Sequence, residues 1–181
     1  MPVIRYRQAT VADAASIADL HARSWRATYR GSYRDEYLDG SLDEERLQVW
    51  TARLSNPPPN QFVVVAEDDG RIVGFACAYG AHDAEGSFLD NIHADPDRHG
   101  EGIGSGLFRT VVDWCRANFP GCGLHLKVFE RNTKARRFYE EFGGIDRGGT
   151  PPSSPWVVVE GVEVRQYAWS TLDAVSAPRR A

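Results

Sequence analysis

Four glycines occupy every second position in the stretch DRHGEGIGSGL (residues 97–107), which leads directly into an apolar helical pattern. Backbone amides that carry no side chains, placed before a helix, form a concave nest with the positive end of the helix dipole behind it. Gly100, Gly102, Gly104 and Gly106 therefore predict a site that suits a pyrophosphate. The plainer interpretation is a tight turn, which glycines before a helix often form.

Two better-known phosphate-binding motifs do not match this stretch. A dinucleotide fingerprint requires G-x-G-x-x-G, but Leu107 stands where a third glycine should follow Gly102 and Gly104. Starting from Gly100 instead places Ser105 at that position. A Walker loop ends in Gly-Lys-Ser or Gly-Lys-Thr, and the stretch contains no lysine. What remains is a nest made by backbone amides alone.

Composition restricts the class of protein. The chain has 181 residues, of which 42% are hydrophobic and 25% charged, as in one globular domain. A formal net charge of -4 and a pI near 5.7 disfavour a general nucleic-acid binder. No apolar run is long enough to cross a bilayer, and MPVIRYRQAT lacks the apolar core of a signal peptide. We therefore expect a cytoplasmic protein with no membrane partner.

The cysteines indicate neither a disulfide framework nor a zinc site. Cys77, Cys115 and Cys122 are odd in number and contain no C-x-x-C pair. We expect reduced thiols, with Cys77 and Cys115 in apolar surroundings.

Strand and helix patterns alternate along the chain, with no internal repeat. The runs QFVVVAE and RIVGFACAYG flank Asp68-Asp69-Gly70, which is a hairpin signature. Ile103, Leu107 and Val111 recur at helical spacing, so the glycines stand at the N-terminus of that helix. The other expected elements are a strand at VIRYRQ, helices after the caps Thr10 and Ser41, strands at Phe88–Ala94 and LHLKVFE, a helix in NTKARRFYEEF, and late strands in WVVV and VEVRQYAW around Glu160-Gly161.

The segment LDNIHADPDRHGEGIGSGL resembles the strand-loop-helix signature of the GCN5-related N-acetyltransferases (GNAT), whose loop pattern is Gln/Arg-x-x-Gly-x-Gly/Ala. His99, Gly102 and Gly104 stand at the three defined positions, and His99 departs from the usual Gln or Arg. Downstream, LHLKVFERNTKARRFYEEFGG is similar to the family's next strand, its asparagine and the helix with the Phe-Tyr pair. Upstream, HARSWRATYRG and DEYLDG are similar to the two-helix substrate region of many bacterial members. The resemblance runs from about Ile4 to about Trp169.

The resemblance implies a single α/β domain with a mixed, mostly antiparallel sheet of six or seven strands that splays beside the nest, and helices on both faces. This domain should cover residues 1–172, and 173–181 should be a disordered tail. Acetyl-coenzyme A is the implied acyl donor, and no metal is expected. The coenzyme-binding residues expected on this basis are Ile92, His93, Ala94, Arg98, His99, Gly100, Gly102, Ile103, Gly104, Ser105, Arg131, Asn132, Ala135, Phe138 and Tyr139.

The ribose phosphate of the coenzyme needs a cation that a glycine nest does not supply. Arg98 and Arg131 are the first candidates, and the basic residues at 134, 136 and 137 are alternatives if they do not form a solvated helix face. Asn132 has an ordinary role as the cap of its helix. By resemblance it also lies beside the pantetheine arm, and both roles are compatible.

Tyr139 is the candidate general acid. The coenzyme thiolate leaves more easily when a group donates a proton to sulfur, and a tyrosine hydroxyl can do so. Tyr139 lies next to the buried face defined by Phe138 and Phe142, and by resemblance it occupies the family's usual acid position. The alternative is a packed tyrosine with a satisfied hydroxyl.

The sequence offers several candidates for the general base. Asp90, Asn91 and His93 lie on the strand beside the nest, and Glu85 precedes it. His93 has the side-chain type whose pKa suits neutral pH, whereas Asp90 can act through water or hold a cationic substrate. Alternation should place Asp90 with Ile92 on one face and Asn91 with His93 on the other, so that only one pair faces the acceptor.

The acceptor site is expected between Trp25 and Asp39. Trp25, Tyr29 and Tyr33 stand near Asp35 and Glu36, and aromatic rings beside carboxylates can hold a cationic amine. The alternative is that the rings pack the helices onto the sheet and the acids are solvated.

Together these residues predict an enzyme that moves an acetyl group directly from acetyl-coenzyme A to a primary amine of a small molecule or peptide, as a monomer or homodimer. Two alternatives stay open: transfer of a longer acyl group, and a non-catalytic acyl-coenzyme A sensor.

Overall fold

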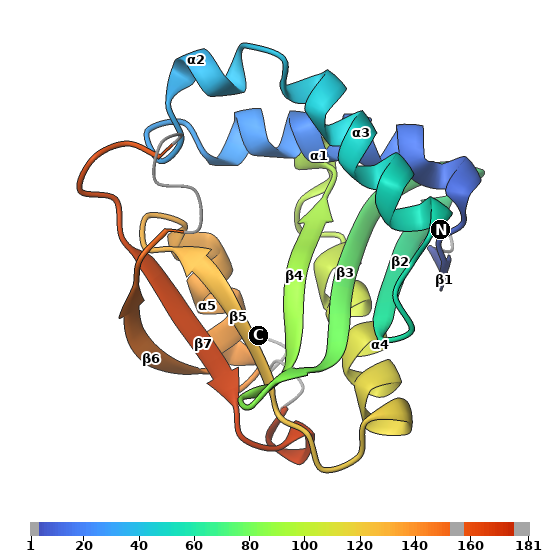
Figure 1. The fold of residues 1–181 in the computed structure, drawn as a ribbon, viewed down its shortest axis with the longest axis vertical. Coiled ribbons are helices and arrows are strands. Elements are labelled where there is room, and N and C mark those ends of the chain that lie inside the picture. The colour runs from blue at the N-terminus through green and yellow to red at the C-terminus, as the bar shows by residue number, and fades with distance from the viewer. Residues whose placement is uncertain (1–3, 153–157, 176–181) are drawn as a thin grey trace.

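The chain folds around one sheet of seven strands in the order β1-β2-β3-β4-β5-β7-β6 (Figure 1). The computed structural model describes residues 4–152 and 158–175. All strand pairs are antiparallel except β4 with β5, so the predicted mixed, mostly antiparallel sheet is confirmed. The strands are β1 (Arg5–Gln8), β2 (Gln61–Asp68), β3 (Arg71–Asp83), β4 (Gly86–Ala94), β5 (Leu124–Phe129), β6 (Ile145–Thr150) and β7 (Val164–Trp169).

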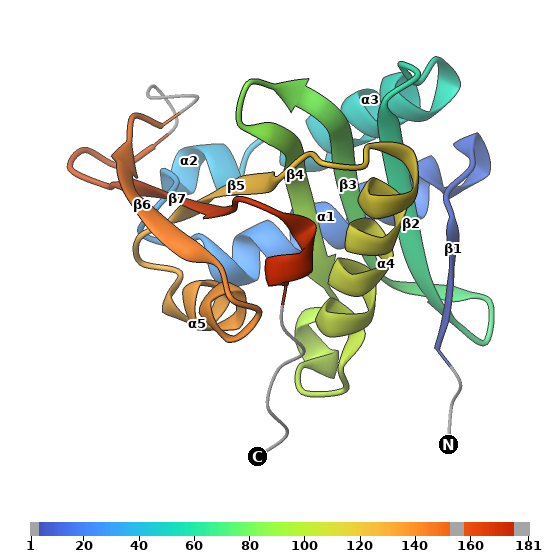
Figure 2. The ribbon, with the colours of Figure 1, turned by 90° about the horizontal axis from the view of Figure 1, so that it is seen from below.

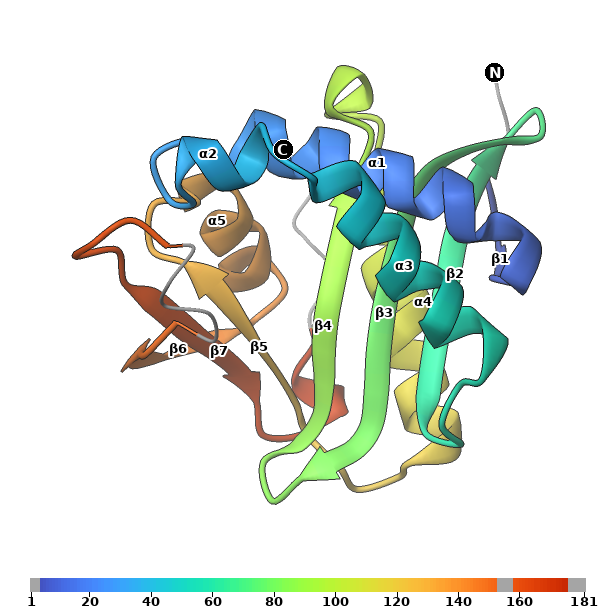
Figure 3. The same cartoon turned by 45° about the horizontal axis from the view of Figure 1, so that its top comes forward.

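Helices cover both faces of the sheet, as Figures 2 and 3 show. The first three α-helices lie over one face, and α4 and α5 lie over the other. No helix in the described ranges is long and apolar enough to cross a membrane. The helices are α1 (Ala14–Thr28), α2 (Asp35–Leu38), α3 (Leu42–Ser55), α4 (Ile103–Asn118) and α5 (Thr133–Glu141), with 3-10 turns η1 (Val11–Asp13), η2 (Pro96–Arg98) and η3 (Leu172–Ala174).

The apolar run of β2 is buried from both sides. Val64 packs in the core under α4, whereas Val63 and Val65 pack under α1 and α3. Successive side chains of a strand point to opposite faces, so an unbroken apolar run marks a strand that is covered on both. The predicted hairpin after β2 is confirmed, because Asp69 and Gly70 turn the chain with φ of 48° and 77°.

The pairing of β4 with β5 is short. It extends over only three residue pairs, from Ser87–Leu124 to Leu89–Leu126. Beyond them β4 stays paired with β3, and β5 stays paired with β7 along its whole length. The facing edges of β4 and β5 therefore have no strand partner beyond Leu89 in the described structure, and the two strands diverge (Figure 1).

A β-bulge accompanies this divergence. Cys77 of β3 pairs with Asn91, but the next residue, Ala78, pairs with Leu89, which leaves Asp90 as an extra residue in β4. Bulges bend a strand and redirect its side chains. The bulge therefore aims β4 away from β5 at the residue where their pairing has ended.

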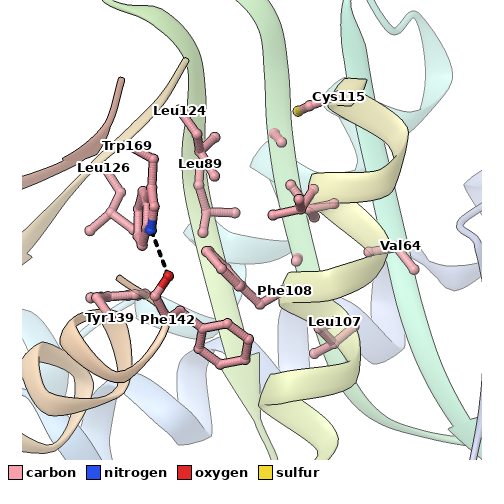
Figure 4. Close-up of a cluster of buried hydrophobic side chains, with 14 of the residues drawn as sticks. Val64, Leu89, Leu107, Phe108, Cys115, Leu124, Leu126, Tyr139, Phe142 and Trp169 are labelled. Atoms are coloured by element: carbon pink, nitrogen blue, oxygen red, sulfur yellow. Dashed lines mark hydrogen bonds between the residues drawn. The ribbon is translucent and has the colours of Figure 1, made fainter. Parts of the chain in front are cut away.

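Aromatic packing fixes α5 against the sheet and α4. The ring of Phe108 lies 4.8 Å from that of Phe142 and 5.2 Å from that of Trp169. The indole Nε1 of Trp169 donates a hydrogen bond to the carbonyl oxygen of Phe142 at 2.9 Å (Figure 4). Tyr139, one turn before Phe142, is held in the same cluster. The position of the Tyr139 ring is thus set by a rigid core.

The end of the chain differs from the sequence-based expectation. β6, with the sequence IDRGGT, was not predicted, because it has two glycines and no apolar alternation. In WVVV only Val158 and Val159 are described, and Val158 forms an isolated bridge with Tyr33 in place of a sheet strand. Of the predicted tail, 173–181, the structure describes only 173–175, and Val175 packs against the main core. Residues 176–181 lie outside the described residues, so the expectation for them stays a prediction.

The expected surroundings of two cysteines are confirmed. Cys77 and Cys115 are both fully buried in the apolar cores.

Two glycines of α4 give opposite predictions for stability. A Cβ at Gly106 would lie 2.0 Å from the Tyr6 hydroxyl oxygen, whereas a Cβ at Gly104 would meet only Phe138, at 3.9 Å. Gly106→Ala should lower the free energy of unfolding by about 1–3 kcal/mol through overpacking. Gly104→Ala should raise it by up to about 1 kcal/mol, because alanine favours a helix over glycine. Urea titration of both variants checks this, and equal effects at the two positions would contradict it.

Candidate functional site

A cavity of about 950 Å³ lies where β4 and β5 diverge. Residues of both strands line it, together with residues of α1 and α3 from one face of the sheet and of α4 and α5 from the other. The cavity therefore passes between the strands and connects the two faces. Of the predicted coenzyme-binding residues, its lining includes Ile92, His93, Ala94, Arg98, His99, Gly100, Gly102, Ile103, Gly104, Ser105, Asn132, Ala135, Phe138 and Tyr139.

The four glycines have three different roles. Gly100 and Gly102 have φ of 92° and 78°, a left-handed backbone that other residues rarely adopt. Gly104 lines the cavity, where an added Cβ would have only Phe138 within 4 Å, and Gly106 makes room for Tyr6. The predicted nest therefore involves the first three glycines, and the fourth is a packing residue.

The start of α4 leaves backbone donors free. The first helical hydrogen bond runs from the Gly106 amide to the Gly102 carbonyl, so the amides of Ile103, Gly104 and Ser105 precede the helical ladder. All three residues line the cavity, and the first turn contains no acidic side chain that would cap these amides. Free amides at the positive end of a helix dipole are groups that can bind an anion, so the geometry agrees with the predicted nest.

The predicted phosphate-binding cations are mostly committed to other groups. Arg98 lines the cavity but pairs with Asp68 and Glu101, each at 2.6 Å. Arg131 lies outside the lining and donates a hydrogen bond to the Gly31 carbonyl. Lys134, which the sequence offered as an alternative, lines the cavity near the nest.

The helix α5 presents Asn132 and Tyr139 to the cavity. Asn132 caps the helix by accepting a hydrogen bond from the Ala135 amide at 3.2 Å, which confirms the predicted cap. Tyr139 is buried, and burial raises the pKa of its hydroxyl, so it stays protonated at neutral pH. No residue in the described structure hydrogen-bonds to this hydroxyl, which leaves the donor available within the cavity.

The bulge in β4 overturns the expected alternation. Asp90 and Asn91 were predicted to point to opposite faces, but both contact the same guanidinium nitrogen of Arg53 in α3, at 2.7 and 3.1 Å. The extra residue resets the pattern, because two successive residues oppose one residue of β3. Asp90 is therefore an ion-paired carboxylate in the cavity wall.

His93 is more deeply buried than the sequence suggested. Its Nδ1 forms a hydrogen bond of 2.9 Å with the Ser24 hydroxyl of α1, and its ring packs 4.8 Å from that of His21. Burial, and to a lesser extent the nearby Arg46 charge, lowers the pKa of His93 to about 3. The expectation of a histidine with a pKa suited to neutral pH is wrong here, because desolvation disfavours the imidazolium.

Aromatic rings surround the end of the cavity near α1. Trp25 stacks on Tyr33 at 4.9 Å, and Phe129 of β5 lies edge-on to Tyr29 and Tyr33 at 5.4 and 5.1 Å. All of them line the cavity. The predicted aromatic residues are thus brought together beside β4.

The predicted acidic residues are not part of this end. Asp35 pairs with Arg30 at 2.9 Å, its side chain is 68% exposed, and it does not line the cavity. Glu36 is likewise exposed and outside the lining. The ionic groups that line the cavity on this face of the sheet are instead Arg46 and Arg53 of α3, Asp90 of β4 and Lys127 of β5.

Sequence reasoning did not identify the two arginines of α3. Their spacing of seven residues places them on one face two turns apart, which is the one signal that the sequence carried. Ser24 and Lys127 also line the cavity without having been singled out. Within the described ranges, no group of three or more His, Cys, Asp or Glu side chains is placed to hold a metal ion.

Comparison with solved structures shows a shared fold. PaiA N-acetyltransferase from Thermoplasma acidophilum, solved in complex with coenzyme A, is 19% identical with a TM-score of 0.71, over 92% of this chain and 99% of that one. A putative acetyltransferase from Salmonella typhimurium, solved with its cofactor acetyl-CoA, is 20% identical with a TM-score of 0.68, over 99% of both chains. The fold implied by the sequence resemblance is therefore confirmed.

Sequence comparison agrees. An uncharacterized N-acetyltransferase from Methanocaldococcus jannaschii is 36% identical over 90 residues, which is 49% of this chain and 55% of that protein. Another from Mycobacterium tuberculosis strain H37Rv is 31% identical over 85 residues, 47% of this chain and 53% of that protein. The chain thus spans about half the length of the curated relatives that it matches. Residues 17–144 match the model of the acetyltransferase (GNAT) family, and the chain belongs to this family.

Proposed function

We propose that this protein transfers the acetyl group of acetyl-coenzyme A directly to a primary amine. The observation that carries the proposal is the single cavity in which a free anion nest, two unpaired strand edges and the buried Tyr139 hydroxyl meet. Two structures with this fold hold coenzyme A or acetyl-CoA, which supports the choice of acyl donor.

The residues around the nest fit the coenzyme's pyrophosphate. The amides of residues 103–105 are free, and no Cβ or neighbouring atom crowds Gly100 and Gly102. Lys134 supplies a cation at this end, where Arg98 and Arg131 are held by other groups. The pantetheine arm contains amides, and the free edge of β4 beyond Leu89 offers backbone donors and acceptors for them.

Tyr139 is the proposed general acid. The donor supplies an acetyl thioester, whose sulfur becomes a thiolate when the amine attacks. A protonated hydroxyl beside the strand edges can donate to that sulfur, and the raised pKa of Tyr139 keeps its proton in place. The Phe108, Phe142 and Trp169 cluster holds the ring, so the hydroxyl needs no reorganisation.

For the amine, we propose that Asp90 receives or orients the ammonium group. Asp90 is the acidic side chain in the described cavity lining, and Arg53 fixes its carboxylate. His93 is too weak a base at neutral pH, and its neutral ring serves as a wall of the acceptor site. The amine then gives its proton to Asp90, or to water by way of Asp90.

The nest can be tested by blocking it without straining the backbone. Gly104→Leu should abolish the rise in melting temperature that coenzyme A produces, because its side chain would occupy the space in front of the free amides. Asp113→Leu, at an exposed position of the same helix, is the matched control and should retain the rise. A normal thermal shift in Gly104→Leu would show that the coenzyme binds elsewhere.

Tyr139→Phe should lower kcat roughly ten- to a hundred-fold, because it removes only the donated proton. The Kd for coenzyme A should change little, since the ring and its packing remain. Steady-state release of free thiol, together with calorimetric binding of coenzyme A, measures both quantities. An unchanged kcat would exclude Tyr139 as the acid of the rate-limiting step.

The low pKa of His93 makes a prediction about pH. Its folded-state pKa of about 3 lies below the usual 6.5, so His93 is already neutral throughout the range from about pH 5 to pH 8. The plot of kcat/KM against pH should therefore rise as the amine loses its proton, without a separate break near 6.5. His93→Gln should leave the shape of the profile unchanged. A break near 6.5 that disappears in this variant would identify His93 as the base.

A further inference from the structure

The acceptor end of the cavity contains a guanidinium that the transfer mechanism does not use. Arg46 and Arg53 both extend from α3 into the cavity wall. Arg53 is matched by Asp90 and Asn91, which accept hydrogen bonds from it. Arg46 has no comparable partner inside the cavity.

The environment of Arg46 is largely closed. Its side chain is only 12% exposed, and its guanidinium lies over the Trp25 ring, 4.7 Å from the ring centre. The preceding residue, Glu45, does not line the cavity. Its carboxylate accepts one hydrogen bond from Nη2 of Arg46 and another from the Tyr37 hydroxyl. The Nε atom is buried and has no hydrogen-bond partner in the described structure.

This arrangement leaves the charge incompletely satisfied. An arginine has five N–H donors, and leaving buried donors of a charged group unpaired is costly. A flexible surface arginine would turn to water, but the cation–π contact with Trp25 holds this guanidinium beside the cavity. The guanidinium is therefore preorganised for a planar oxyanion such as a carboxylate.

The other charges at this end point to the same ligand chemistry. Asp90 is the acidic group of the described lining, and Arg53 already balances it. His93 is neutral, as burial lowers its pKa to about 3, and burial likewise keeps His21 neutral. Glu45 occupies only one nitrogen of Arg46, so an acceptor that carries only positive charge would leave the other donors of Arg46 without a partner. An acceptor with both an amine and a carboxylate would supply one.

We propose that Arg46 binds the carboxylate of the acceptor and that the acceptor is a free amino acid with an apolar side chain. This inference rests on the proposed acetyl transfer to an amine. Asp90 would orient the amino group, Arg46 would hold the carboxylate, and Tyr29, Tyr33 and Phe129 would pack against the side chain. A protein N-terminus fits less well, because its first residue has no free carboxylate.

The test compares amino acids with their carboxamides, which keep the amine and the side chain but lack the negative charge. With saturating acetyl-CoA, kcat/KM should be about a hundred-fold higher for leucine or phenylalanine than for the matched amide. Arg46→Gln should lower kcat/KM for the acids about ten- to a hundred-fold, mainly through KM, and leave the value for the amides nearly unchanged. Arg46→Lys should recover part of the loss, because it restores charge without the planar fork.

Arg30→Gln is the matched control, since Arg30 is an exposed arginine near the same helices that does not line the cavity. It should leave kcat/KM for both acids and amides unchanged.

If Arg46 has a purely structural role, its substitution will lower kcat/KM for acids and amides equally, which would overturn the proposal. Preference for amides or for a polyamine such as spermidine would also overturn it while leaving acetyl transfer intact. If the Arg46 variants fold poorly, the acid-to-amide ratio of the wild-type chain still decides whether the acceptor needs a carboxylate, and a ratio near one overturns the proposal. If no tested amine is acetylated, the proposed function is wrong, and the present inference is wrong with it.

Discussion

The hydrogen-bonded pairing of β4 with β5 stops after Leu89–Leu126, and each strand keeps its partner on the other side. This places unpaired backbone edges inside the protein, where such edges are normally covered. The extra residue at Asp90 keeps β4 apart from β5, because a bulge bends the strand and redirects its side chains. The cavity, the free edge and the ion pair between Asp90 and Arg53 all follow from this early end of one strand pair.

The two faces of the sheet contribute different chemistry to that cavity. From the α4 and α5 face come free amides, Lys134 and the phenol of Tyr139, which suit an anionic ligand and a developing negative charge. From the α1 and α3 face come aromatic rings and Arg46 beside the Asp90–Arg53 pair. Dense aromatic packing around Phe108 on one side and Trp50 on the other keeps both sets rigid. Two ligands entering from opposite faces would meet between the strands.

The sequence predicted most of the fold and most of the residues that line the α4 and α5 side of the cavity, because those features depend on local patterns. Apolar periodicity located α4, Asp-Gly marked the hairpin, and Asn132 marked the start of α5. The glycine spacing indicated the nest, although it could not show that Gly106 serves packing against Tyr6.

The acceptor end was less accessible from sequence because it depends on tertiary contacts. A bulge has no local signal, so the strand alternation of Asp90 and Asn91 was assigned incorrectly. The burial of His93, and hence its low pKa, arises from residues of α1 and α3 that lie far away in the chain. Asp35 was an obvious acidic candidate until Arg30 was seen to pair with it, and Arg46 gained significance only through its place over Trp25.

A crystal structure of the protein with coenzyme A bound would show whether the cavity holds the coenzyme. We expect the pyrophosphate to contact the amides of residues 103–105, and the pantetheine arm to run between β4 and β5 with its amides paired to the β4 edge beyond Leu89. A coenzyme bound away from this cavity, or one that leaves the β4 edge unpaired, would contradict this expectation.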